Sequence, residues 1–133
     1  METVASDIMS NEVLTATEST TLEDVLKTMI NNRITGMPVI DSEGKMIGVI
    51  SESDILAQLS GKELLHPEVF QEPIVFNRQI KCIRDETSLE EIMDIFINTR
   101  VRRLPAVDSV GHLIGIVSKR DLMRLFYYRA KLL

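Results

Sequence analysis

The feature that most constrains the fold is an internal repeat with an offset of 67 residues. The stretch "GVISESDIL" at 48–56 returns as "GIVSKRDLM" at 115–123, and residues 20–59 align with 87–126 without a gap. Most aligned positions pair an apolar residue with an apolar residue. Repetition at one fixed offset indicates two copies of a single supersecondary unit. Because a unit of about 55–60 residues buries too little surface to be stable alone, we expect the two copies to pack together.

Both copies predict the same order of elements, which is strand, helix, strand, strand, helix. Apolar residues at helical spacing over 20–32 and 87–99 predict the first helices, each opened by a Thr-x-x-Glu capping box. Two short apolar segments joined by a turn with glycine predict a hairpin in each copy, followed by a second helix. The predicted parts are strands at 12–16, 37–41, 45–51, 79–83, 104–108 and 112–118, capping boxes Thr20/Glu23 and Thr87/Glu90, and turns at Gly44 and Gly111.

The predicted fold class is therefore α/β (α+β), built from two repeats of the same unit. We divide the chain into a first repeat at 1–60, a linker at 61–73 and a second repeat at 74–133. Gly61, Pro67 and Pro73 mark the linker, which has room for one helical turn.

Charge is unevenly distributed between the two halves. Residues 1–66 hold 4 Lys and Arg against 11 Asp and Glu, while residues 67–133 hold 11 against 9, so the net charge of −5 divides into −7 and +2. An overall acidic chain argues against a nucleic-acid partner, and an anionic ligand would meet the second half. No apolar run approaches the roughly 18 residues that span a bilayer, so we expect no membrane insertion.

The sequence lacks the motifs that would indicate secretion, metal binding or catalysis. The start "METVASDIMS" has no basic segment of the kind that opens a signal peptide, and the single cysteine, Cys82, fits a reducing cytoplasm. His66 and His112 lack partners at ligand spacing, so no metal is expected. Without a nucleophile signature or a glycine-rich phosphate loop, the sequence does not predict an enzyme.

The element order and the repeated motifs resemble a known family. The strands "GMPVID" and "RLPAVD", with the doubled G-[VI]-x-S-x-x-D-[IL], are similar to a pair of CBS domains, called a Bateman module. The resemblance covers about residues 7–126. It implies that the copies pack sheet to sheet about a pseudo-twofold axis and form two clefts. Such clefts bind adenosine-containing ligands, so it implies a regulatory sensor of AMP, ADP or ATP, without a catalytic cofactor, that forms a homodimer and acts on an unknown protein.

Ser and Asp of the doubled motif are the first candidate ligand residues. By resemblance, Asp54 and Asp121 hold the ribose, and Ser51 and Ser118 help with ribose or phosphate. Both pairs also have the form of a helix capping box, which alone would keep them in both copies. The glycines that precede them, at 48 and 115, are expected to let a flat ring or sugar approach the backbone closely.

Four cations distinguish the second copy from the first. Arg is suited to bidentate contact with phosphate, and a solvated basic face paired with nearby Glu is the alternative. These cations are Arg102, Arg103, Lys119 and Arg120, which replace Thr35, Gly36, Glu52 and Ser53 of the first copy.

Adenine contacts follow from the resemblance by position. The ring would lie between the strand before the first helix and the residues around the proline. These positions are Thr15, Met37 and Pro38 for one cleft and Cys82, Leu104 and Pro105 for the other. An ordinary core role is the alternative for Met37 and Leu104, and Cys82 departs from the Thr often found at its position.

Two functions remain open on the sequence alone. One is a regulatory module that senses adenine nucleotides, and the other is a structural dimerisation module without a ligand. The tail at 122–133 is apolar and basic. Binding to a membrane surface or to a partner helix are two alternatives for it. We favour a third, in which the tail extends the last helix into a dimer contact.

Overall fold

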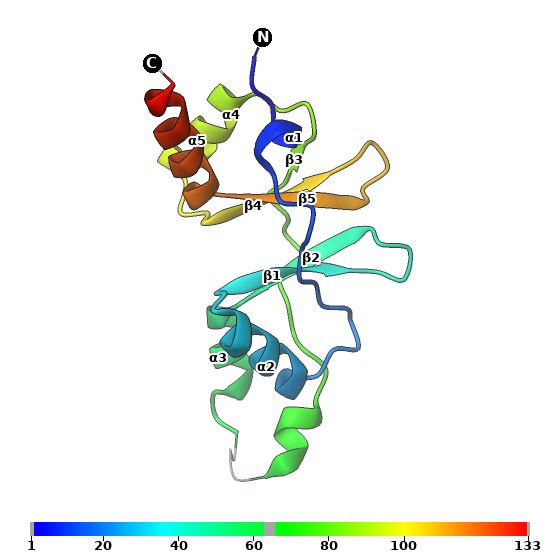
Figure 1. Ribbon diagram of the computed structural model, residues 1–133. Helices are drawn as coiled ribbons and strands as arrows, with labels where there is room; N and C mark the ends of the chain where they lie inside the picture. Colours follow the sequence, from blue (N-terminus) through cyan, green and yellow to red (C-terminus); the bar gives the residue numbers. More distant parts are fainter. Residues whose placement is uncertain (1, 63–65, 133) are drawn as a thin grey trace. The chain divides into compact units, whose positions relative to one another are not determined.

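The computed structural model describes residues 2–62 and 66–132 and contains two compact units (Figure 1). One unit is continuous and comprises Leu14–Ile80. The other combines Met1–Val13 with Lys81–Leu133. Each unit contains one copy of the repeat, so each is described by itself. The division into repeats at 1–60 and 74–133 and their packing about an axis stay predictions.

The continuous unit has a two-stranded sheet with helices packed on it. Strands β1 (Gly36–Ile40) and β2 (Met46–Ser51) pair in antiparallel register. Its core joins the sheet to the helices and includes Leu22, Val25, Val39 and Ile50. The helices are α2 (Leu22–Asn32), α3 (Glu52–Leu59) and the 3-10 helix η1 (Pro67–Gln71).

The second unit repeats this arrangement with one more strand. Its sheet has the order β3-β4-β5, with β3 parallel and β5 antiparallel to β4. A separate core forms here and includes Ala5, Ile92, Leu104 and Val117. The elements are α1 (Ala5–Ile8), β3 (Ile83–Arg84), α4 (Leu89–Asn98), β4 (Arg103–Val107), β5 (Leu113–Ser118) and α5 (Lys119–Lys131). The predicted mixed α/β class with two repeated units is confirmed.

Both hairpin turns are closed by an aspartate and a glycine. Gly44 and Gly111 adopt positive φ values of 83° and 91°, which glycine adopts at little cost. Asp108 Oδ1 accepts hydrogen bonds from the backbone N–H groups of Val110 and His112, and Asp41 does the same for its turn. Desolvation raises the pKa of Asp108, but these backbone hydrogen bonds and the His112 side chain together hold it below the ordinary value.

The leading strands are shorter than predicted. Within 12–16, only Ala16 pairs with the sheet, in a parallel bridge to Val39. Its counterpart Ile83 lies at the same register in the second unit, opposite Ala106. The prediction therefore holds at the last residue of each segment, where the side chain is buried.

The caps of the first helices lie one residue after the predicted capping boxes and are single hydrogen bonds to one hydroxyl each. Thr21 Oγ1 and Ser88 Oγ, rather than those of Thr20 and Thr87, accept the helical N–H at the starts of α2 and α4. The preceding threonines instead bind the turn before the helix, where Thr87 accepts from Arg84 N–H at 2.8 Å. Thr20 does the same for its own turn, so these hydroxyls close turns rather than helices.

Replacement of the observed cap tests this assignment. Ser88→Ala is expected to reduce the free energy of unfolding by about 1 kcal/mol, because the Glu91 N–H loses its acceptor. Urea denaturation measures the change. A variant as stable as the parent would indicate that Thr87, and not Ser88, caps α4.

Short segments from elsewhere in the chain complete each hairpin sheet. Ser10 forms an antiparallel bridge with Ile116 on β5, and Asn77 forms one with Val49 on β2. Each bridge has two backbone hydrogen bonds of 2.8 to 2.9 Å. Residues 10 and 77 are themselves 67 positions apart. Ser10, which precedes the aligned residues 20–59, therefore completes the sheet of 87–126, and Asn77, which precedes 87–126, completes the sheet of 20–59.

Candidate functional site

Candidate ligand residues lie where a hairpin strand ends and a helix begins. In the continuous unit, Ser51 ends β2 and caps α3. Its Oγ accepts from the Asp54 N–H at 3.4 Å, while Asp54 Oδ2 accepts from the Ser51 N–H and Oγ–H, both at 2.9 Å. The serine and the aspartate therefore form a reciprocal capping box.

The second unit repeats this junction between β5 and α5. Ser118 Oγ accepts from the Asp121 N–H at 3.2 Å, and Asp121 Oδ2 accepts from the Ser118 N–H at 2.7 Å. The capping-box interpretation is thus confirmed in both copies. Among residues 2–62 and 66–132, Oδ1 of each aspartate has no hydrogen-bond partner, so one acceptor oxygen remains available to a ligand.

The glycines of the motif have a structural role that corrects the sequence prediction. A Cβ at Gly48 would lie 2.5 Å from the carbonyl oxygen of Asn77 and 2.5 Å from the Phe76 ring. A Cβ at Gly115 would lie 2.6 Å from the Met9 sulfur and 3.0 Å from the Ser10 carbonyl oxygen. The space in the side-chain direction is filled by the chain's own completing segments and is not left for a ring or sugar.

Cations gather at the junction of the second unit. Arg103 begins β4 directly opposite Ser118 in the β4–β5 register, and Lys119 and Arg120 form the first turn of α5. Arg102 precedes Arg103 and is exposed. Within the described part of the chain none of the four forms an ion pair, so the alternative of pairing with nearby Glu finds no support there.

Residues that the resemblance assigned to adenine divide by burial. The four on the sheets, Met37, Pro38, Leu104 and Pro105, are buried, and Met37 and Leu104 belong to the cores of their units. Thr15 and Cys82 are exposed, one residue before the bridges of Ala16 and Ile83 to their sheets. The core interpretation of Met37 and Leu104 is confirmed, and their contact with a ring stays a prediction.

The predicted residues separate into one group for each unit. The continuous unit holds Thr15, Met37, Pro38, Ser51 and Asp54. The other unit holds Cys82, Arg102, Arg103, Leu104, Pro105, Ser118, Lys119, Arg120 and Asp121. Because only the second group contains cations, the two junctions differ in charge although their capping geometry is the same.

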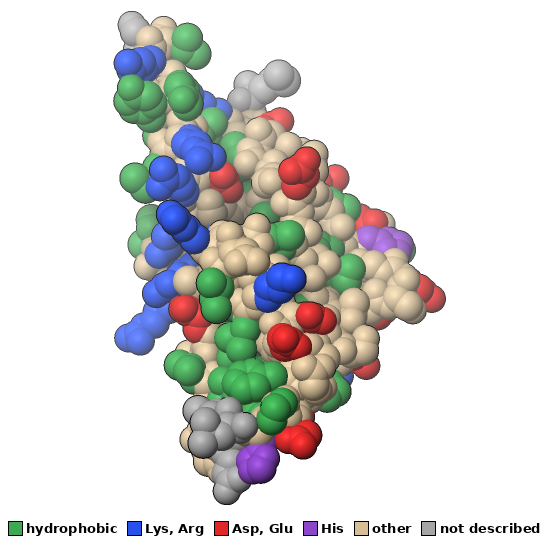
Figure 2. Space-filling model, turned by 60° about the horizontal axis from the view of Figure 1, so that its bottom comes forward, with side chains coloured by type: hydrophobic (Ala, Val, Ile, Leu, Met, Phe, Trp, Pro, Cys, Tyr) green, Lys and Arg blue, Asp and Glu red, His purple; other side chains and the backbone are tan. Residues whose placement is uncertain are grey.

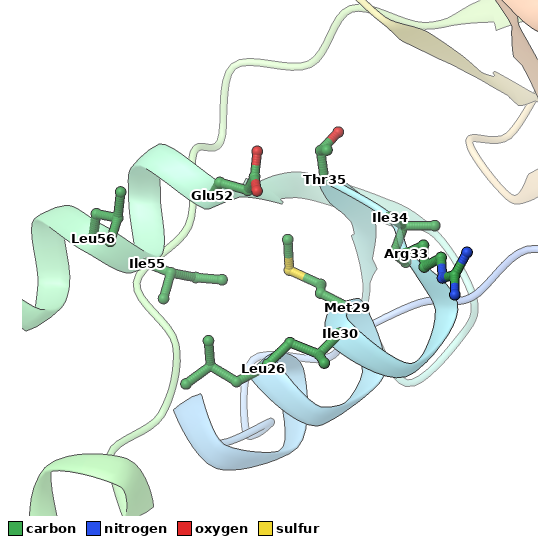
Figure 3. A pocket seen from close by; sticks show the side chains of 9 residues that line it. All are labelled: Leu26, Met29, Ile30, Arg33, Ile34, Thr35, Glu52, Ile55 and Leu56. Carbon is green, nitrogen blue, oxygen red and sulfur yellow. The ribbon is translucent and has the colours of Figure 1, made fainter.

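An apolar pocket between α2 and α3 was not anticipated from the sequence (Figure 3). Its volume is about 360 Å³, and the side chains of both helices point toward it. Ile30, one of the apolar residues at helical spacing in 20–32, is 71% exposed, and Leu56 on α3 is 69% exposed. The lining residues are Leu26, Met29, Ile30, Arg33, Ile34, Thr35, Glu52, Ile55 and Leu56.

In 2–62 and 66–132 no three His, Cys, Asp or Glu side chains gather in a way that would hold a metal ion. No helix in these ranges is long and apolar enough to cross a membrane.

Comparison with family models identifies the repeat. The model described as "CBS domain" matches twice, at residues 5–61 and 72–128. The chain belongs to the CBS domain family. Each match contains one hairpin and one Ser-x-x-Asp junction, so the internal repeat is a pair of CBS domains.

Curated relatives and solved structures agree with this assignment. The chain is 33% identical over 131 residues to CBS domain-containing protein CBSX1, chloroplastic, of Arabidopsis thaliana, covering 80% of this chain and 56% of the relative. It therefore spans about half the length of that protein. The crystal structure of the CBS-pair protein CBSX2 from Arabidopsis thaliana has a TM-score of 0.84 at 27% identity, covering 98% of this chain and 99% of that chain. CBSX2 solved in complex with AMP has a TM-score of 0.81 at 28% identity, covering 96% and 98%.

Proposed function

We propose that this CBS pair is a regulatory module that binds an adenosine-containing ligand, AMP, ADP or ATP, and has no catalytic activity of its own. The ribose would be held by Asp54 or Asp121, and phosphates would lie near Arg103 or Arg120. The observation that carries the proposal is the second junction, where cations without ion pairs surround the start of a helix. The AMP complex of CBSX2, similar over nearly the whole chain, supports the choice of ligand.

Electrostatics favour a phosphorylated ligand at the second junction. The unpaired N–H groups at the start of α5 carry partial positive charge, to which Arg103, Lys119 and Arg120 add full charges. The first junction has Gly36, Glu52 and Ser53 at the same positions and so lacks these cations. We therefore expect the second junction to bind nucleotides with more phosphates more tightly.

Isothermal titration with AMP, ATP and adenosine tests the proposal directly. Saturable binding of AMP or ATP with defined stoichiometry is the expected result. Absence of binding to the folded chain would instead support the second candidate, a structural dimerisation module. That candidate is favoured by one observation, since the capping boxes by themselves explain why Ser and Asp occur in both copies.

Loss of one cation should discriminate between ligands. Arg120→Ala is expected to weaken ATP binding by about tenfold and adenosine binding little, because only phosphates meet the guanidinium. Titration of both ligands measures the difference. Ser53→Ala, the equivalent position of the first repeat, is the matched control and should leave both affinities unchanged. Equal losses for ATP and adenosine in Arg120→Ala would exclude a phosphate contact.

We further propose that the module forms a homodimer and regulates another protein, which the chain's own residues do not identify. A cytoplasmic location is proposed from the single exposed cysteine, Cys82, which fits a reducing compartment.

A further inference from the structure

The second junction is formed by two stretches of the chain that are basic and contain no acid. Residues 100–107 and 113–120 together hold four Arg and one Lys, and no Asp or Glu. The equivalent stretches of the first repeat, 33–40 and 46–53, hold one Arg and one Glu. The second repeat therefore has five positive charges where the first has no net charge. Figure 2 shows Lys and Arg side chains continuing in a row over α5, interspersed with hydrophobic ones.

Strand register and the helix start bring three of these charges to one place. Arg103 pairs with Ser118 across β4 and β5, and directly opposite residues of antiparallel strands have side chains on the same face. Lys119 and Arg120 follow Ser118 in the first turn of α5, whose N–H groups add partial positive charge. Within the part of the chain that the structure describes, none of the three cations forms an ion pair. An anionic ligand would therefore meet charges that no carboxylate of these residues neutralises.

The same junction offers little to a metal ion carried by the ligand. Asp121 is the one acid of α5, and its Oδ2 accepts from the Ser118 N–H at 2.7 Å, while Oδ1 is the proposed ribose acceptor. Mg²⁺ in nucleotide sites is usually held by one or two protein carboxylates together with the phosphates. No group of three His, Cys, Asp or Glu side chains suited to a metal occurs among the described residues. The junction thus provides cations for phosphate oxygens and no second carboxylate for Mg²⁺.

We propose that the second junction binds ATP and ADP in their metal-free forms, so that Mg²⁺ competes with the module for these nucleotides. Mg²⁺ bridges the β- and γ-phosphate oxygens of ATP and neutralises part of their charge. Arg103, Lys119 and Arg120 would contact the same oxygens, so Mg²⁺ and the three side chains exclude one another. AMP has a single phosphate that holds Mg²⁺ weakly, and its binding is little affected. The module then responds to free Mg²⁺ as well as to nucleotide, and AMP replaces ATP on it as Mg²⁺ rises.

This inference rests on the proposed nucleotide site and adds the form of the nucleotide that the site takes. Isothermal titration of the whole chain with ATP and with AMP tests it, once in EDTA and once in excess Mg²⁺. Ionic strength is matched between the two buffers, because salt alone weakens contacts between exposed charges. The affinity for ATP is expected to fall at least tenfold in Mg²⁺, which corresponds to the loss of about one charged hydrogen bond to phosphate. The affinity for AMP should change little.

Two double variants test whether the charge of the junction causes the effect. Lys119→Glu with Arg120→Ser gives the second junction the residues that Glu52 and Ser53 provide in the first. This variant should bind metal-free ATP more weakly than the parent, and Mg²⁺ should then change its affinity for ATP little. Lys119→Arg with Arg120→Lys keeps both charges and is the matched control, so it should lose affinity in Mg²⁺ as the parent does. A melting curve of each variant shows that it is folded at the temperature of the titration.

AMP binding separates this inference from the proposed function beneath it. If AMP bound in both buffers and ATP bound equally or more tightly in Mg²⁺, the metal-free form would be wrong and the regulatory site would stand. If neither nucleotide bound in either buffer, both would be wrong. A Mg²⁺ effect of parental size in the variant with Lys119→Glu and Arg120→Ser would mean that the discrimination arises away from the second junction, which would contradict the proposal.

Discussion

Gly48→Ala is expected to lower the free energy of unfolding by about 3 kcal/mol, the upper part of the range for overpacked positions. The added Cβ would lie 2.5 Å from the Asn77 carbonyl oxygen and 2.5 Å from the Phe76 ring. The Asn77 carbonyl group cannot turn away without loss of pairing, because Asn77 is hydrogen-bonded to Val49 through both its N–H and its C=O. The segment at 76–77 must therefore move off β2, which urea denaturation would report as a lower midpoint.

Gly115→Ala is the matched comparison at the equivalent position. Its Cβ would meet the Met9 sulfur at 2.6 Å and the Met9 Cγ at 2.8 Å, both in a flexible side chain, while the Ser10 carbonyl oxygen lies at 3.0 Å. Rotation of Met9 relieves most of this overlap, so we expect a loss of about 1 kcal/mol. If Gly115→Ala proved as damaging as Gly48→Ala, rigid backbone contact would not be the cause.

Much of the fold could be predicted because the repeat has local signals. Helical spacing, the glycine turns and the Ser-x-x-Asp starts of α3 and α5 each depend on residues close in sequence, and they appear twice at the same offset. The completing segments could not be predicted in this way. Residues 7–19 share no identical pair with 74–86, and Ser10 and Asn77 within them each pair with the hairpin of the other aligned copy, which no local pattern indicates.

Errors at individual residues have similar physical causes. Thr20 and Thr21 are adjacent, and the hydroxyl of either residue suits a helix cap. Because the Thr20 hydroxyl accepts the Thr17 N–H in the preceding turn, the Thr21 hydroxyl caps α2. Periodicity placed Ile30 on the apolar side of its helix, but periodicity does not tell which residues of that side are covered, and Ile30 is exposed.

Candidate ligand residues were predicted in part by pattern and in part by resemblance. The Ser-x-x-Asp pattern predicted a capping box, and the structure confirms it at both junctions. A ribose contact leaves no separate mark in the sequence, because the same carboxylate serves both purposes. Separating the two roles therefore requires a measurement that reports on affinity and stability at once.

Asp121→Ala is expected to weaken nucleotide binding at its junction by tenfold or more. The Oδ1 atom, which has no partner within 2–62 and 66–132, is proposed to accept a hydrogen bond from a ribose hydroxyl. A hydrogen bond to a charged group contributes about 1.5–3 kcal/mol, which corresponds to this loss of affinity. Calorimetric titration with AMP and ATP measures the affinity, and a melting curve of the same sample measures the loss of the cap.

Ser88→Ala is the matched control for this experiment, because it removes a helix cap in the same unit without touching the junction. Both variants should melt at a lower temperature than the parent, since each helix start loses a hydrogen bond. Only Asp121→Ala should also lose affinity, which separates the ribose contact from general destabilisation. The double variant Asp54→Ala, Asp121→Ala removes the proposed contact from both junctions. If that double variant bound nucleotide with the affinity of the parent, the aspartates would be capping residues only, and the proposed ribose contact would be wrong.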